Sequence, residues 1–116
     1  QFGRSIGANQ SIAFQLAQAR VDIEATRQMT YNVARQCDSG VPIRDLIIDV
    51  CSTKLFASQA VVRVTQVALH VAGGWGITEE FPVMQMLLDS LAAPVTVGSD
   101  EIQLRQIARQ MGLQCD

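Results

Sequence analysis

Aromatic residues, histidine and clustered positive charge are all scarce in this sequence. These scarcities limit the kind of core, the metal sites and the partners that the chain can have. Aromatic side chains make up 5% of the 116 residues and hydrophobic ones 48%, so aliphatic side chains must fill the core. The formal net charge is −2 and no basic run is present, which argues against a nucleic-acid partner held by its phosphates. No apolar run approaches the roughly 20 residues of a membrane span, so we expect none.

Cysteine and histidine are too few and too scattered to indicate a metal site. Cys37, Cys51 and Cys115 are widely spaced and form no C-x-x-C pair. A structural zinc ion needs four ligands, and the single His70 cannot complete such a set. We therefore expect reduced thiols and no metal.

Apolar residues recur at three- and four-residue spacing over most of the chain, as they do in amphipathic helices. The spacing predicts one long helix over about 10–37, which "DSGVP" ends, because Gly40 and Pro42 both suit a helix stop. A second long helix is expected over about 44–71, with an apolar surface wide enough for it to be well buried. Two long helices joined by a short turn must lie antiparallel.

Two shorter helices should follow. Thr78 can open the first of them, with Pro82 in or near its first turn, and "AAP" ends it. Ser99 or Asp100 can cap the second, which should run to about Met111. The chain is therefore predicted to be all-α, an antiparallel up-and-down four-helix bundle that forms one domain over residues 1–116. Because it opens at "QFGRSIGANQ" without Met or a leader, we expect it to be part of a longer parent.

Three glycines and the only tryptophan interrupt the helical pattern at "VALHVAGGWGITEEFP", residues 67–82. The simplest interpretation of Gly73, Gly74 and Gly76 is a helix stop with a close crossing, because glycine permits both. Backbone amides freed at such a break can also face a phosphate or a carbonyl-rich ring system. If the amides of residues 73–74 and those of residues 98–101 bind one such ligand, both segments should be exposed and should border one groove.

Three blocks of the sequence resemble, in order and at the right mutual spacing, the C-terminal helical domain of the acyl-CoA dehydrogenase flavoprotein family. They are "QFGRSIGANQSIAFQLAQARVDIEATR", "KLFASQAVVRVTQVALHVAGGWGITEEFPV" and "GSDEIQLRQIAR", which together cover essentially the whole chain. The resemblance implies a parent with an N-terminal helical domain, a middle β-domain and this bundle. Such proteins bind FAD between the middle domain and the bundle, and they assemble as dimers or tetramers.

The resemblance places four residues near the FAD of a neighbouring subunit or within hydrogen-bonding reach of FAD. Phe2 would pack against a partner subunit's FAD, and Gln10 matches a family glutamine that hydrogen-bonds FAD; an exposed polar residue at a helix start is the simpler role of Gln10. Gly73 and Gly74 match the family's Gln-x-x-Gly-Gly segment, and their backbone would approach the neighbour's FAD phosphates.

Three further residues complete the expected cofactor set. His70 stands where the family usually has glutamine but keeps a donor and an acceptor, so an FAD contact and an ordinary helix-surface role are both open. Ser99 and Glu101 match FAD-contacting positions at a helix N-terminus, where phosphate and ribose oxygens are well received. Helix capping alone is the simpler role of both.

The sharpest departure from the family lies in the turn before the last helix. There the dehydrogenases commonly have Glu-Gly-Thr, whose glutamate is the catalytic base that removes the α-proton of the acyl-CoA thioester. This chain has Val97, Gly98 and Ser99 instead. The resemblance assigns Gly98 to the substrate, but Val97 has no titratable group, so no catalytic residue is expected in this chain. Asp100 and Glu101 are poor substitutes, because they should point toward capping and FAD.

Three explanations of Val97 stay open. The base can lie upstream on an earlier helix, or this subunit can be the non-catalytic half of a mixed oligomer. The parent can also be a relative whose chemistry needs no carboxylate there, such as a flavin monooxygenase.

The resemblance implies an FAD-dependent oxidoreductase that dehydrogenates acyl-CoA thioesters, with this chain supplying FAD contacts and an oligomer interface. A non-catalytic structural or oligomerisation subunit is the alternative. The electron acceptor and the acyl-chain specificity are not implied. The expected location is cytoplasmic in a bacterium and mitochondrial or peroxisomal in a eukaryote.

Overall fold

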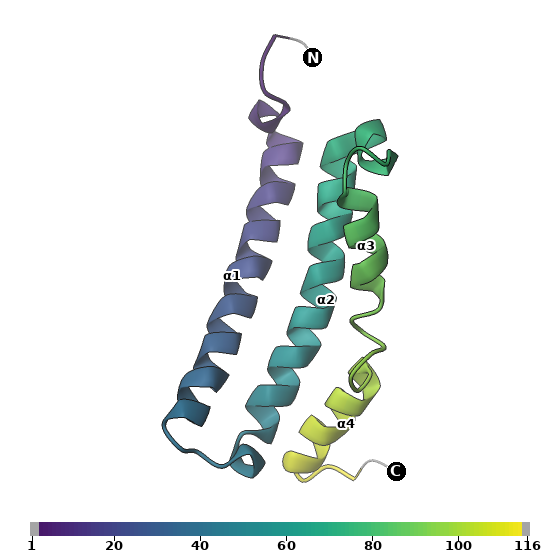
Figure 1. Cartoon of the computed structure of the whole chain (residues 1–116). Coiled ribbons are helices and arrows are strands. Elements are labelled where there is room, and N and C mark those ends of the chain that lie inside the picture. Colours follow the sequence, from purple (N-terminus) through teal and green to yellow (C-terminus); the bar gives the residue numbers. More distant parts are fainter. Residues whose placement is uncertain (1–2, 115–116) are drawn as a thin grey trace.

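The computed structural model describes residues 3–114, and within them it contains helices and no strands. The four α-helices are α1 (Gln10–Asp38), α2 (Ile47–Ala72), α3 (Val83–Leu91) and α4 (Asp100–Gln110), shown in Figure 1. Three short 3₁₀ helices join or precede them: η1 (Ile6–Ala8), η2 (Ile43–Asp45) and η3 (Gly73–Ile77). The all-α prediction is confirmed, and both long helices begin and end within about three residues of the expected positions.

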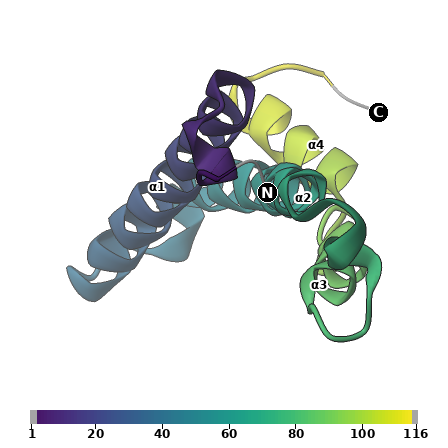
Figure 2. The same cartoon turned by 90° about the horizontal axis from the view of Figure 1, so that it is seen from above.

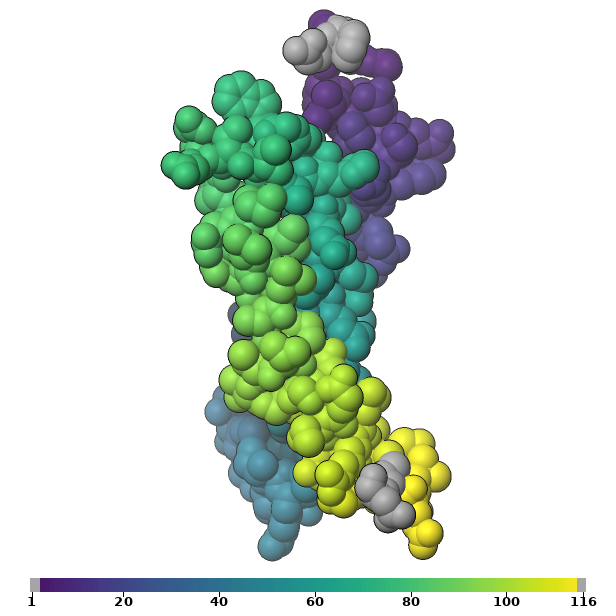
Figure 3. Space-filling model, turned by 90° about the vertical axis from the view of Figure 1, so that its right-hand side faces the viewer, coloured from purple at the N-terminus to yellow at the C-terminus, as the bar shows by residue number. Residues whose placement is uncertain are grey.

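Helix α2 is the centre of the domain. It runs antiparallel to α1, and on its other side α3 packs along its C-terminal half while α4 packs along its N-terminal half (Figure 1). Seen from above, α1 lies on one side of α2, and α3 and α4 lie on the other side (Figure 2). The two short helices therefore follow each other along α2, which makes the molecule elongated, 56 × 28 × 24 Å (Figure 3).

The turn after α1 has the predicted glycine stop. Gly40 has a φ of +86° and its N–H donates to Cys37 O at 2.9 Å, while the Val41 N–H donates to Gln36 O at 3.1 Å. This pair of bonds satisfies two of the last carbonyls of α1, and the left-handed conformation favours glycine. The Gln36 side chain then donates to Asp49 Oδ2 at 3.0 Å, which ties the turn to α2.

The third helix starts later than predicted. Thr78 has extended backbone angles, and both its N–H and its hydroxyl donate to Trp75 O, at 3.1 and 2.9 Å. Thr78 therefore closes η3 rather than opening the next helix. Helix α3 begins at Val83, directly after Pro82, whose fixed φ of −73° suits a helix start.

Polar side chains connect α2 to its neighbours. Arg63 Nε donates to Asp22 Oδ2 on α1 at 2.9 Å, and the Arg63 guanidinium lies 5.6 Å from the centre of the Phe56 ring. The hydroxyls of Thr65 and Ser90 are 2.9 Å apart and join α2 to α3. Side-chain hydrogen bonds thus fix the positions of α1 and α3 on α2.

The buried core is thin, and α2 is less buried than predicted. The buried residues within 3–114 are small or polar apart from one leucine: Ala19, Leu46, Cys51, Ala60, Gly76, Asp22, Ser58, Ser90 and Gln103. Many large apolar side chains are exposed, among them Phe14 (64%) and Trp75 (72%). Apolar exposure on this scale is typical of a surface that meets other protein.

One helical segment within residues 3–114 bears on the expectation of no membrane-spanning segment. Residues Ile47–Ile77, α2 with η3, are long and apolar enough to cross a membrane by length and composition alone. The central helix of a helical domain has the same composition. Here it carries Ser58 and Arg63, which are hydrogen-bonded to acidic side chains of other helices.

Candidate functional site

The turn between α3 and α4 contains two consecutive residues in the left-handed region. Val97 has a φ of +53° and is the one residue other than glycine with a positive φ within residues 3–114; Gly98 has a φ of +82°. A β-branched residue in this conformation is strained, and such strain persists only where the surroundings hold it. Val97 is also 93% exposed, so packing of its own side chain does not hold it.

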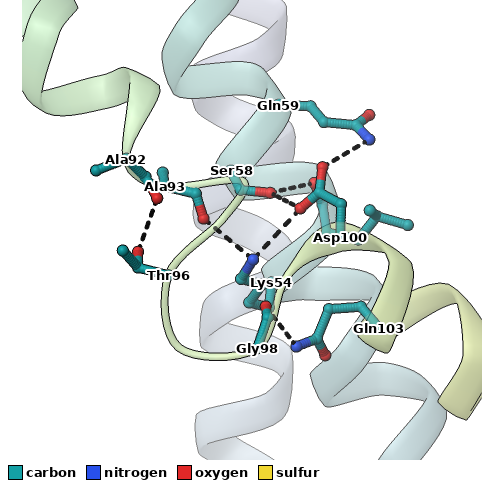
Figure 4. A network of polar contacts seen from close by, with 10 residues as sticks. Lys54, Ser58, Gln59, Ala92, Ala93, Thr96, Gly98, Asp100 and Gln103 are labelled. Carbon is teal, nitrogen blue, oxygen red and sulfur yellow. Dashed lines mark hydrogen bonds and ion pairs between the residues drawn. The ribbon is translucent and has the colours of Figure 1, made fainter.

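A network of polar contacts on α2 fixes the two ends of this turn (Figure 4). Lys54 Nζ donates to Ala93 O at 3.1 Å and lies 3.3 Å from Asp100 Oδ1. Ser58 Oγ donates to the same carboxylate oxygen at 2.7 Å, and Gln59 Nε2 donates to Asp100 Oδ2 at 3.1 Å. Asp100 therefore faces α2, which corrects the prediction that its side chain points to capping and cofactor.

The Asp100 carboxylate is stabilised in its ionised form. Burial raises the pKa of Asp100, but the hydrogen bonds from Ser58, Gln59 and Lys54 and the Lys54 charge outweigh it, so the pKa lies below its ordinary value. Two further bonds brace the turn from inside: the Asp100 N–H donates to Pro94 O at 2.9 Å, and Gln103 Nε2 donates to Gly98 O at 3.1 Å.

Gly98 is required twice over. Besides its positive φ, a Cβ at this position would lie 2.7 Å from Gln103 Nε2, the atom that donates to Gly98 O. The backbone of Gly98 is thus packed against the buried Gln103 side chain from within and partly exposed on its outer side. A ligand can approach it only from the outer side.

The start of α4 has one acidic side chain that faces solvent. Ser99 is the N-cap residue, as predicted, but its side chain makes no capping hydrogen bond to the helix. The Ser99 hydroxyl and the Glu101 backbone N–H lower the pKa of the Glu101 carboxyl. Glu101 is exposed, so its carboxylate, unlike that of Asp100, faces solvent.

Of the three clustered glycines, Gly73 and Gly76 are needed by the fold, whereas Gly74 is not constrained by it. Gly73 ends α2 with a φ of +59°, and its N–H donates to Leu69 O, so this donor is used within the helix. Gly76 is buried, and a Cβ there would lie 2.8 Å from Leu69 Cδ1. Gly74 is exposed, has no positive φ and has nothing within 4 Å of a Cβ, so neither conformation nor space requires glycine there. The helix-stop interpretation thus holds for Gly73 and Gly76.

The remaining predicted residues gather at the same end as the glycines. Because α1 and α2 are antiparallel, Gln10 at the start of α1 lies at the end of the molecule where α2 stops (Figures 1 and 3). Gln10 and His70 are both exposed. His70 also lines an open groove of about 330 Å³ between α1 and α2, together with Gln15, Gln18, Ala19, Asp22, Arg63, Gln66 and Val67. Phe2 lies outside the described residues.

The two turns do not border one groove, contrary to expectation. Asp100 is hydrogen-bonded to Ser58, and Gly73 is fifteen residues further along α2, which corresponds to about 22 Å at 1.5 Å per residue. Val97 lines a different open groove of about 480 Å³, which shares no residue with the groove beside His70. A ligand group bound at one turn therefore occupies a different place from a ligand group bound at the other.

The sequence did not reveal the role of Lys54 and Ser58. Both lie on the helix whose surface is mostly apolar, and the one available signal was the positive charge of Lys54 within that stretch. Its partner, Asp100, is 46 residues away in the sequence, so the pairing depends on the fold. No group of three histidine, cysteine or acidic side chains suited to a metal occurs in residues 3–114.

Comparison with known proteins identifies the domain. The family model described as the C-terminal domain of acyl-CoA dehydrogenase matches residues 1–112. The short-chain specific acyl-CoA dehydrogenase of Megasphaera elsdenii is 36% identical over 104 residues, which are 90% of this chain and 26% of that protein.

Solved structures agree with this match. The butyryl-CoA dehydrogenase structure from Megasphaera elsdenii superimposes with a TM-score of 0.88 at 33% identity, over 96% of this chain and 28% of that one. The FAD complex of PigA superimposes with a TM-score of 0.90 at 28% identity, over 97% of this chain and 29% of that one. The chain spans about a quarter of the length of the curated relatives it matches. It belongs to the acyl-CoA dehydrogenase family and corresponds to the family's C-terminal domain.

Proposed function

We propose that residues 1–116 act as the C-terminal domain of an FAD-dependent oxidoreductase that introduces an α,β double bond into acyl-CoA thioesters. The family match supports this, as do the relatives named for short-chain acyl-CoA and butyryl-CoA dehydrogenation. The single structural observation that carries the proposal is the Val97–Gly98 turn, a strained, exposed turn braced from behind by α2. Strain that the rest of the fold sustains is typical of ligand-binding sites.

The residues at the start of α4 fit part of an FAD molecule. The Ser99 hydroxyl and the exposed Glu101 carboxylate can both accept hydrogen bonds from ribityl or ribose hydroxyls. A carboxylate repels a phosphate, so Glu101 suits the hydroxyl-bearing portion of the cofactor better than the pyrophosphate. When bound, FAD would supply the hydride acceptor of the reaction.

The residues at the end of α2 fit a second cofactor molecule. Gly73 and Gly74 are exposed with open space on their outer side, which allows a ligand to approach the backbone closely. The separation of about 22 Å along α2 from the other turn favours contact with a neighbouring subunit's FAD, with Gln10 and His70 contributing from the same end. A homodimer or homotetramer would supply that neighbour, and the exposed apolar side chains would supply its interface.

This chain contributes no base to the reaction. Val97 occupies the expected position of the carboxylate and cannot accept a proton, and Asp100 is held by three side chains of α2. The chain's role would be to place Gly98 beside the thioester and Ser99 beside the flavin, while a carboxylate elsewhere in the parent removes the α-proton. For the parent we propose the cytoplasm of a bacterium, or a mitochondrion or peroxisome.

A second candidate function follows from the same valine. A residue that is 93% exposed and cannot ionise is also what a non-catalytic subunit would have, and such a subunit would serve structure and oligomerisation. A flavin-dependent relative whose reaction needs no base at this position, such as a monooxygenase, would retain the FAD contacts.

Flavin content and flavin reduction separate these functions. The purified parent should be yellow, and anaerobic addition of butyryl-CoA or a longer acyl-CoA should abolish the absorbance of oxidised flavin. A colourless protein that takes up no FAD would contradict every flavin-dependent function. A yellow protein whose flavin no acyl-CoA reduces would contradict the dehydrogenase function. The non-catalytic structural subunit and the flavin monooxygenase would then remain as candidates. Light scattering should show a dimer or larger oligomer, and a monomer would contradict the proposed subunit contact.

A further inference from the structure

Lys54 is the only lysine in the sequence, and the other positively charged side chains at neutral pH are arginines. It lies near the start of α2, and its side chain is 23% exposed. Its ammonium group makes two contacts, one with the backbone oxygen of Ala93 at 3.1 Å and one with Asp100 Oδ1 at 3.3 Å. Both contacts join segments that are about 40 or more residues apart in the chain.

These two acceptors flank the strained turn. Ala93 follows the last turn of α3, and Asp100 is the first residue of α4, so one ammonium group bridges both ends of residues 94–99 (Figure 4). A compact ammonium with tetrahedral donors can serve two acceptors that lie in different directions. A guanidinium is planar and better suited to two acceptors side by side.

The other contacts of the turn do not replace this bridge. Thr96 Oγ1 donates to Ala92 O at 2.8 Å, and Gln103 donates to Gly98 O, but each of these bonds reaches only one side of the turn. Ser58 and Gln59 fix Asp100 and make no contact with the α3 side. Lys54 is the one side chain among these that connects both sides, alongside the backbone bond from the Asp100 N–H to Pro94 O.

A direct role for Lys54 in binding an anion fits the structure less well. The groove beside it has no second cation among its lining residues, which besides Lys54 are Thr26, Ala57, Ser58, Val61, Ala93, Thr96 and Val97. Two acceptors already engage the ammonium group, and one of them carries a full negative charge. The charge of Lys54 is therefore largely neutralised within the protein.

We propose that Lys54 is a positioning residue: by bridging Ala93 and Asp100 it holds the Val97–Gly98 turn and the start of α4 in the conformation that receives cofactor and thioester. The functional half of this inference rests on the proposed function. Lys54 acts through the turn and does not itself touch the ligand.

The test compares three variants of the parent enzyme: Lys54→Met, Lys54→Arg and, as a matched control, Arg44→Met. Arg44 lies in η2, and its side chain is 83% exposed, so its replacement removes one positive charge without disturbing the turn. Amide hydrogen exchange is measured for residues 92–104 and for α1, and FAD affinity is measured by titrating the apoprotein. Because a charge-assisted hydrogen bond is lost, Lys54→Met should speed exchange at the Asp100 amide by about tenfold or more.

The same variant should weaken FAD affinity by a similar factor, while exchange in α1 stays at the wild-type rate. Lys54→Arg keeps a cation beside Asp100 and should recover part of both losses, and Arg44→Met should match the wild type. Unchanged exchange in residues 92–104 in Lys54→Met would overturn the inference, as would faster exchange there with unchanged FAD affinity. If the wild type takes up no FAD, the proposed function fails and with it the functional half of this inference, whereas the exchange data still decide whether Lys54 holds the turn.

Discussion

The carboxylate of Asp22 accepts a hydrogen bond from Arg63 Nε at 2.9 Å across the α1–α2 interface, and Asp22 as a whole is only 7% exposed. Removing the arginine would leave a buried carboxylate without its charged partner. Because Arg63 itself is 46% exposed, water compensates for part of this loss. Arg63→Met should therefore lower the free energy of unfolding by about 1–3 kcal/mol, measured by urea denaturation.

The control for that variant is Arg20→Met. Arg20 pairs with Glu24 at 3.6 Å on the exposed face of α1. Its loss should change stability by less than about 0.5 kcal/mol. Equal losses of stability in the two variants would show that the Asp22–Arg63 pair does not hold α1 and α2 together.

Acid should weaken the attachment of α4 to α2. The pKa of Asp100 is below its ordinary value in the folded protein, so its contribution to stability is fully present above the unfolded value of about 3.9 and is lost as the pH falls through the folded pKa. Lys54 is the charged group that acts on Asp100, and the Asp100 charge in turn acts on the neighbouring Glu101.

Urea denaturation of the wild type and Asp100→Asn across pH 2.5–7 measures this contribution. The wild type should be the more stable at neutral pH, and the difference should shrink once the pH falls below about 4. A difference that stays constant down to the lowest pH would contradict the ionised, hydrogen-bonded carboxylate.

Two glycine substitutions should differ sharply in how much they destabilise the fold. Gly98→Ala places a Cβ 2.7 Å from Gln103 Nε2 and an alanine at a φ of +82°, so it should cost about 1–3 kcal/mol. Gly74→Ala meets nothing within 4 Å at an ordinary φ and should leave stability within about 0.5 kcal/mol of the wild type. Thermal unfolding measures both. A Gly74→Ala variant as unstable as Gly98→Ala would show that the structure of η3 is wrong.

Val97 should be the rare position at which glycine stabilises. Its φ of +53° strains a β-branched residue, and its side chain is 93% exposed, so Val97→Gly removes strain and sacrifices no packing. A gain of about 0.5–1 kcal/mol is expected in urea denaturation. Val95→Gly is the control, because Val95 is 70% exposed and has no positive φ, and it should be destabilised. A loss of stability in both variants would contradict the strain.

Helix positions were predictable from the sequence because apolar spacing and local stop signals determine them. Gly40 and Pro42 end α1 through their own backbone geometry, which no distant residue alters. Thr78 misled the prediction, because a threonine after a glycine-rich break can close the preceding turn as readily as open the next helix. Choosing between the two needs the structure of η3.

The site was predictable in part. Matching positions placed Val97, Gly98 and Ser99 in one turn, and the structure confirms that this turn precedes the last helix. The sequence could not show that Asp100 turns toward α2, because Lys54 and Ser58 become its neighbours only after α3 and α4 pack along that helix. It also could not show that the two turns lie at different levels of α2, since that distance depends on where α4 docks.

The most direct measurement is the FAD affinity of the apoprotein of the full-length parent with the start of α4 altered. Ser99→Ala removes one expected hydrogen-bonding group, and Glu101→Gln replaces a charged acceptor with a neutral amide. Each should weaken FAD binding by roughly 3- to 30-fold. Asp45→Asn is the matched control: it changes a carboxylate to an amide in η2, far from the turn, and should bind as the wild type does. If all three variants bind FAD with wild-type affinity, or if the wild type binds none, the account of this turn as a cofactor contact is contradicted.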